Sequence, residues 1–208
     1  MRRGGAVLVT GAARRIGRAI VERLARDGFP IAVHASARSF GEAESLVSGI
    51  VAQGGRAMAI AADLADAAET GSLVARATEA IGPLSHLVNN ASIFEPDTAK
   101  DFAADDFDRN MAINLRAPLL LAQAFAAALP EGTSGSIVNL VDQRVLRPDP
   151  NYFSYSLSKA GLWAATKTMA QAFAPRVRVN AVGPGPVLPN ANEGQAAFDN
   201  ELKVVPLR

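Results

Sequence analysis

The chain of 208 residues contains no cysteine, which excludes disulfide bonds and thiolate metal sites. It has only two histidines, His34 and His86, and they share no ligand spacing, so we expect no metal site. Because a chain without cysteine suits a reducing compartment, we expect a cytoplasmic location.

The sequence also lacks an excess of one charge and a long apolar run. Its 21 Lys and Arg residues against 20 Asp and Glu give a formal net charge of +1, whereas a general nucleic-acid binder has a large basic excess. No apolar run approaches the roughly 18 residues that cross a bilayer. The apolar stretch near the N-terminus is interrupted by Arg14 and Arg15, too early for a signal peptide. We therefore expect a small-molecule substrate, no nucleic acid and no membrane.

What the sequence does contain is an alternation of short apolar segments with longer segments of helical period. The strand-like segments are 6–10, 31–35, 57–62, 86–91, 135–141 and 176–182, and the longest helical ones are 105–129 and 152–173. This pattern predicts one domain, 1–208, of the α/β class: a three-layer, doubly wound Rossmann-type parallel sheet. Residues 183–208 begin with a segment rich in Gly, Pro and Asn, and we interpret them as a loop region on the substrate side. Ligands bind such sheets at the carboxyl ends of the strands.

The end of the first strand carries the segment TGAARRIGRAI, residues 10–20. Gly11 and Gly17 allow a tight turn and the close approach of a diphosphate to backbone N–H groups. Arg14, Arg15 and Arg18 crowd the start of the following helix, where each cation costs about 0.3–1 kcal/mol. A bound polyanion reverses the sign of that cost. The alternative is that these arginines simply point to water.

The end of the second strand lacks an acidic residue until Glu42. A fold that binds NAD usually has Asp or Glu near this point to hold the ribose 2′-hydroxyl. Arg38 and Ser39 suit a 2′-phosphate instead, with Arg15 on its other side. The sequence therefore predicts NADP(H) as the cofactor.

A candidate catalytic set follows the fifth strand. Tyr155 and Lys159 are four residues apart and share a helix face. A phenol ordinarily titrates near pH 10, and one ammonium about 4 Å away supplies roughly the energy needed to use it near pH 7. Asp142, at the end of the preceding strand, is placed to donate, shuttle or orient a proton. The alternatives are an ordinary Tyr-x3-Lys helix pair and an Asp that caps a turn.

With these residues assembled, the chain resembles the short-chain dehydrogenase/reductase family over nearly its whole length. The matching segments are TGAARRIG at 10–17, ADL at 62–64, NNAS at 89–92, INLRAP around Asn114, Tyr155 with Lys159, and RVNAVGPG at 178–185. The resemblance implies an NAD(P)-dependent oxidoreductase in which Tyr155 donates a proton and Asn114 holds a relay water. Lys159 would bind the nicotinamide ribose and lower the pKa of the phenol.

The resemblance also assigns the cofactor path. It implies contacts from Gly11, Arg15, Ile16, Gly17, Arg38, Ser39, Asp63, Leu64, Asn90, Ala91, Ser92, Tyr155, Lys159, Pro184 and Gly185. The family continues after a VPLR-like segment with one more helix and strand, which build much of a subunit interface. Because this sequence stops at Arg208, we expect it to lack that helix and strand, and we expect the family's homo-oligomer where they are present.

Two substitutions resemble one subgroup of the family, the pteridine reductases and the similar dihydromonapterin and dihydrofolate reductases of bacteria. Arg15 stands where the family has a glycine, and Asp142 stands where it has the catalytic serine. Phe94 matches the ring that stacks a pterin in that subgroup, although it could serve only to pack its loop. The implied reaction is hydride transfer from NADPH to a pterin C=N bond, with Asp142 and Tyr155 as a coupled acid. The alternatives are a carbonyl reductase, such as a 3-oxoacyl thioester reductase, and a non-catalytic NADP-binding protein.

Overall fold

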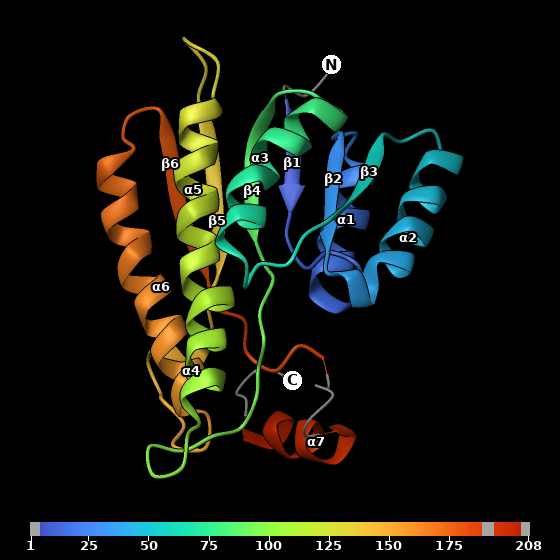
Figure 1. The fold of residues 1–208 in the computed structure, drawn as a ribbon. Helices are drawn as coiled ribbons and strands as arrows, with labels where there is room; N and C mark the ends of the chain where they lie inside the picture. The colour runs from blue at the N-terminus through green and yellow to red at the C-terminus, as the bar shows by residue number, and fades with distance from the viewer. Residues whose placement is uncertain (1–4, 189–193, 205–208) are drawn as a thin grey trace.

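The computed structural model describes residues 5–188 and 194–204. Six strands form one parallel sheet in the order β3-β2-β1-β4-β5-β6 (Figure 1). The strands are β1 (Ala6–Val9), β2 (Ile31–Ala35), β3 (Ala57–Ala61), β4 (Leu84–Asn89), β5 (Gly135–Leu140) and β6 (Val177–Val182). The strand order reverses between β1 and β4, so a ligand crevice is expected beyond the carboxyl ends of these two strands. The predicted doubly wound parallel sheet is confirmed.

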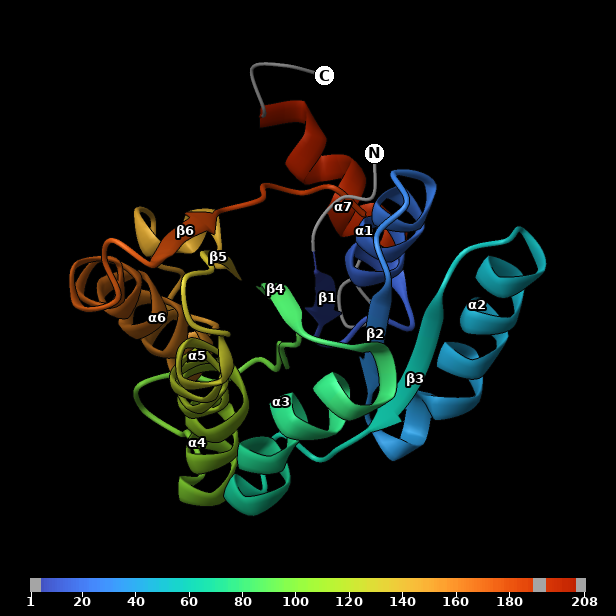
Figure 2. The same ribbon diagram turned by 90° about the horizontal axis from the view of Figure 1, so that it is seen from above.

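Helices cover both faces of this sheet. Helices α1 (Arg15–Arg26) and α2 (Phe40–Ala52) lie on one face, and α3 (Ala67–Ile81), α5 (Ala117–Ala128) and α6 (Phe153–Ala172) lie on the other (Figure 2). Alternate residues of β1 enter two separate cores: Val7 and Val9 face α1 and α2, while Leu8 faces α3 and α5. Every residue of β1 and β2 is buried, as a parallel sheet covered on both faces requires.

The helix predicted over 105–129 is present but interrupted. Helix α4 (Ala104–Met111) continues through a π-helical segment, η2 (Ala112–Arg116), into α5. Such segments are rare and occur frequently at functional sites. Asn114, fully buried, lies inside this one.

Taken together, Ala104–Ala128 is long and apolar enough to cross a membrane by length and composition alone, because it contains an 18-residue window with a mean hydropathy of 1.3. The sequence expectation, based on unbroken apolar runs, missed this stretch. Its apolar character has a local explanation, because Leu121 and Phe125 are buried in the core shared with α3. A core helix passes the same test of length and composition.

The interpretation of 183–208 as a loop is wrong in part. Helix α7 (Gly194–Val204) lies beyond the carboxyl ends of the strands, away from the sheet (Figure 1). The residues rich in Pro and Asn end before Gly194, and the segment from 195 to 204 contains neither Gly nor Pro. Residues 189–193, and the VPLR segment at 205–208 used in the expectation about the family's last helix and strand, lie outside the described residues.

A buried histidine ties together the ends of the first three strands. The Gly11 N–H donates to Nδ1 of His34 at 3.1 Å, so the ring proton is on Nε2, which donates to the Ala62 carbonyl at 3.1 Å. Burial lowers the pKa of His34 to about 4. The ring is therefore neutral in the folded protein, and it fixes the turn that follows β1.

We predict that His34 makes the protein acid-sensitive. Between about pH 6.5 and 4 the unfolded chain binds a proton that the folded chain does not, so stability falls as pH decreases through this window. The loss attributable to His34 approaches about 3 kcal/mol at the acid end of the window. Urea unfolding of the wild type and of His34→Gln, carried out from pH 7.5 to 4.5, measures this loss in the free energy of unfolding. The variant should lose less stability on acidification, and parallel curves would contradict the assignment.

Candidate active site

A cleft of about 860 Å³ opens at the carboxyl ends of the strands. It is lined from the turns after β1, β2, β3, β4 and β5 and from the segment after β6. Apart from Asn114, the structure brings all the residues predicted from the sequence into its lining: Gly11, Arg15, Ile16, Gly17, Arg38, Ser39, Asp63, Leu64, Asn90, Ala91, Ser92, Phe94, Asp142, Tyr155, Lys159, Pro184 and Gly185.

The two glycines are required by close packing of the turns after β1 and β4. Gly11 has a φ of 59°, and a Cβ there would lie 2.7 Å from Cα of Ala91. A Cβ on Gly17 would lie 2.6 Å from Nδ2 of Asn90. That amide donates to the carbonyls of Thr10 and Gly11, both at 2.9 Å. Asn90 therefore holds the glycine turn from the side, a role that the sequence did not reveal.

Arg15 occupies a backbone conformation that normally belongs to glycine. Its φ is 52°, in the left-handed region, which costs an arginine about 1 kcal/mol. This explains why the family has a glycine at the position, and the retained strain points to a functional side chain. The Arg15 guanidinium lines the cleft and donates to the Leu188 carbonyl at 3.2 Å, so it connects the glycine turn to the segment after β6.

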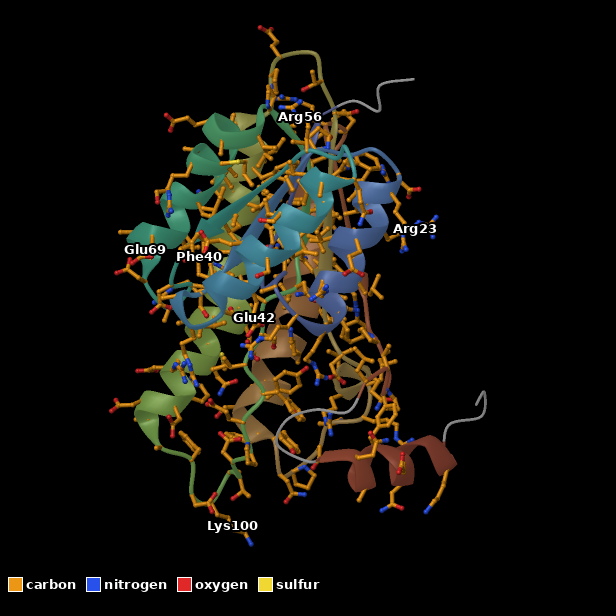
Figure 3. All side chains as sticks on the ribbon, turned by 90° about the vertical axis from the view of Figure 1, so that its right-hand side faces the viewer. Arg23, Phe40, Glu42, Arg56, Glu69 and Lys100 are labelled. Carbon is orange, nitrogen blue, oxygen red and sulfur yellow. The ribbon has the colours of Figure 1, made fainter. Side chains whose placement is uncertain are left out.

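The neighbouring arginines divide between the cleft and the surface. Arg14 lines the cleft and pairs with Glu42, which is labelled on α2 in Figure 3, at 3.2 Å. Arg38 is exposed and lines the cleft from the short helix η1 (Ala37–Ser39). Arg18 instead pairs with Glu22 at 2.8 Å and lines a groove on another side of α1. The idea that all three arginines of the first helix serve one anion is therefore wrong for Arg18.

The predicted acid pair is formed. The Tyr155 hydroxyl donates to Oδ2 of Asp142 at 2.7 Å. Asp142 also caps the short helix η3 (Gln143–Val145), with Oδ1 accepting from the Arg144 backbone N–H at 2.9 Å. The alternative that Asp142 caps a turn is therefore confirmed, while its part in proton transfer stays a prediction. Burial, together with the charge and hydrogen bond of Asp142, raises the pKa of Tyr155 far above its usual value.

This direction is opposite to the expected lowering of the phenol's pKa by Lys159. Lys159 is buried, donates to the Leu140 carbonyl at 2.8 Å, and has its Nζ 5.8 Å from the centre of the Tyr155 ring. Burial of the phenol is the largest cause of the raised pKa of Tyr155, and the charge and hydrogen bond of Asp142 add to it. Burial also lowers the pKa of Lys159 itself to about 8.

Asn114 supports the site from behind. Its Oδ1 accepts from the Ile93 N–H at 2.9 Å and from the Ser92 hydroxyl at 3.1 Å, and its Nδ2 donates to the Ile93 carbonyl at 2.9 Å. Nδ2 also lies 3.2 Å from the Ser158 hydroxyl. The π-helical segment thus positions the 92–94 segment through one amide, while the relay water assigned to Asn114 stays a prediction.

Phe94 stands at the centre of an aromatic cluster. Its ring is stacked on Tyr152, with centroids 4.0 Å apart and planes at 9°, and it meets the Tyr155 ring edge-on at 4.7 Å. The Arg144 guanidinium carbon lies 4.9 Å from the centres of both the Phe94 and Tyr152 rings. Sequence reasoning missed Tyr152, Arg144 and His34 because nothing in their spacing indicates these contacts.

We predict that Asn114→Ala destabilises the protein by about 3 kcal/mol, because it strips buried partners from Ser92, Ile93 and Ser158. Urea unfolding measures the loss, with Asn151→Ala, an exposed amide, as control. The control should lose less than about 1 kcal/mol. Equal losses in the two variants would show that Asn114 is not a support of the site.

Comparison with known proteins agrees with this geometry. A family model described as short chain dehydrogenase matches residues 5–199. FolM alternative dihydrofolate reductase 1 from Brucella canis, crystallised with NADP, is 46% identical with a TM-score of 0.95, covering 100% of this chain and 82% of that chain. A blue fluorescent protein from a metagenomic library, crystallised with NADPH, is 37% identical with a TM-score of 0.90, covering 98% and 83%.

The 3-oxoacyl-[acyl-carrier-protein] reductase of Synechocystis sp. is 33% identical over 96% of this chain and 81% of its own length. The matched family model covers the glycine turn, the acid pair and the whole described sheet. The chain therefore belongs to the short chain dehydrogenase family.

Proposed function

We propose that this chain is an NADPH-dependent oxidoreductase that reduces a pterin C=N bond, as in a dihydropterin or dihydrofolate. The observation that carries the proposal is the hydrogen bond of Tyr155 to a carboxylate, Asp142, beside the Phe94 ring. A carboxylate–phenol pair suits proton delivery to a ring nitrogen, and an aromatic ring suits a flat heterocycle.

The chemistry of the cleft fits a phosphorylated dinucleotide. The glycine turn leads directly into the N-terminus of α1 at the edge of the cleft, and α1 has no acidic residue in its first turn that would repel a phosphate. Arg14, Arg15 and Arg38 line the cleft, and their charges suit the phosphates of the cofactor. Solved neighbours were crystallised with NADP or NADPH, which supports the same cofactor here. Bound NADPH supplies the hydride.

The protein's own residues then have separate tasks. Phe94 provides the surface against which the heterocycle lies, and the 92–94 segment is held by Asn114. Tyr155 and Asp142 hold the proton that the reduced nitrogen receives, and they act as one coupled acid. Lys159 lines the cleft with its Nζ 5.8 Å from the centre of the Tyr155 ring, and it would bind the nicotinamide ribose.

A carbonyl reductase is the second candidate, and the 3-oxoacyl-[acyl-carrier-protein] reductases among the relatives favour it. Asp142 argues against it. Negative charge develops on a carbonyl oxygen during reduction, and a carboxylate 2.7 Å from the Tyr155 oxygen repels it. The retention of Asp142, Tyr155, Lys159 and Asn114 together argues against a non-catalytic NADP-binding protein.

Absorbance at 340 nm with a substrate panel tests the proposal. NADPH should be consumed with dihydropterin or dihydrofolate, and Tyr155→Phe should abolish this consumption while cofactor binding is retained. Consumption with a ketone or 3-oxoacyl thioester alone would establish the second candidate. Binding of NADPH without consumption of any kind would establish a non-catalytic protein.

We predict that Arg38→Ala weakens NADPH binding about 10- to 100-fold, because a charge-assisted contact with the 2′-phosphate is lost. The affinity for NADH should change by less than about threefold, because NADH has no such phosphate. Fluorescence titration of both cofactors measures the two affinities. Equal weakening of both would contradict the assignment of Arg38.

The substrate of the family is a small molecule, and we infer the same class here. The homo-oligomeric assembly and the cytoplasmic location expected from the sequence remain proposals for this chain. Light scattering of the purified protein would determine the assembly.

A further inference from the structure

Arg144 contacts both Asp142, the carboxylate of the acid pair, and the stacked rings of Phe94 and Tyr152. Its backbone N–H holds Oδ1 of Asp142 at 2.9 Å, and its Nη1 lies 4.0 Å from Oδ2, the oxygen that accepts from Tyr155. The same guanidinium lies 4.9 Å from the centres of the stacked Phe94 and Tyr152 rings. Only 13% of the Arg144 side chain is exposed, so water is largely excluded from these contacts and the electrostatic interactions are stronger than at the surface.

A second carboxylate shares the guanidinium. Nη2 of Arg144 lies 3.5 Å from Oδ2 of Asp149. Asp149 is itself fixed, because its Oδ1 accepts from the backbone and side-chain nitrogens of Asn151 at 2.9 and 3.2 Å. One cation therefore lies between two acids, and each acid competes for it.

The charged and titratable groups around Asp142 come from three segments. Arg144 lies on η3, and Tyr155 and Lys159 lie on α6. Asp149 lies on the loop between them. Of these, Arg144 is the cation nearest the oxygen that holds Tyr155, and it opposes the effect of Asp142 on the phenol.

We propose that Arg144 is a positioning residue that joins the acid pair to the stacked rings of Phe94 and Tyr152: it places a positive charge beside the Asp142 carboxyl and orients that carboxyl toward Tyr155, while it holds Phe94 against Tyr152. Asp149 tunes this effect by drawing the guanidinium away from Asp142. The identity of the substrate over Phe94 rests on the proposed function, but the effect of Arg144 on Asp142 does not.

The test uses two variants with opposite expected effects. Arg144→Met removes the cation, so the carboxyl of Asp142 should take up its proton at a pH higher by roughly one to two units. Asp149→Asn removes the competing charge, so the midpoint of the Asp142 titration should move down by about half a pH unit. The readout is the carboxyl ¹³C titration of the NADPH-bound enzyme without substrate, with Asp142 assigned by loss of its signal in Asp142→Asn.

Two further variants separate charge from packing. Arg144→Lys keeps the charge, so the midpoint should stay within about half a unit of wild type. The KM of Arg144→Lys, measured with whichever substrate the wild type reduces, should rise more than its kcat falls, because the contact of residue 144 with the Phe94 and Tyr152 rings is weakened. Arg147→Met removes an exposed charge from the same loop and should leave the midpoint unchanged.

The proposal is overturned if Arg144→Met leaves the midpoint in place, or if Asp149→Asn moves it upward. Should Arg144→Met fail to fold, Asp149→Asn and Arg144→Lys decide the matter by the same criteria. Because the titration needs no turnover, a wild type that fails to reduce pterins would refute the proposed function and leave this result standing.

Discussion

The hydrogen bond between Tyr155 and Asp142 is the interaction on which the account of this protein depends. It joins the turn after β5 to helix α6, two elements that the parallel sheet brings together at its carboxyl edge. A carboxylate in this place keeps the proton on the phenol, since burial and the charge of Asp142 both raise the pKa of Tyr155. The pair therefore holds a proton, which in the proposed reaction it would deliver to the substrate.

Much of the surrounding structure positions this pair without taking part in the chemistry. His34 and Asn90 fix the glycine turn, and Asn114 fixes the segment that carries Phe94. His34 and Asn114 are buried and Asn90 is partly buried, and all three form hydrogen bonds with backbone groups at bends in the chain. Arg15 adds a strained backbone that directs a cation into the cleft. The turns and segments that line the cleft are thus held in place by side-chain hydrogen bonds.

The sequence predicted the sheet because apolar period and turn residues alternate regularly. Residues at strand ends indicated the glycine turn, Arg38 and the Asp142–Tyr155 pair, and the rest of the predicted cleft lining came from the resemblance to the family. It could not predict contacts set by packing between distant turns, such as Phe94 on Tyr152 or Arg144 on both rings. The direction of the Tyr155 pKa shift was missed because it depends on the burial of the phenol and on its contact with Asp142, which follow from tertiary packing. Helix α7 was missed because the Pro- and Asn-rich residues before it dominated the local composition.

A crystal structure of the protein with NADPH and a non-reducible pterin analogue tests the central claim most directly. The account predicts the heterocycle against Phe94, with a ring nitrogen within about 3 Å of the Tyr155 hydroxyl or the Asp142 carboxylate. A heterocycle bound away from Phe94, or Asp142 turned out of the cleft in that complex, would contradict it.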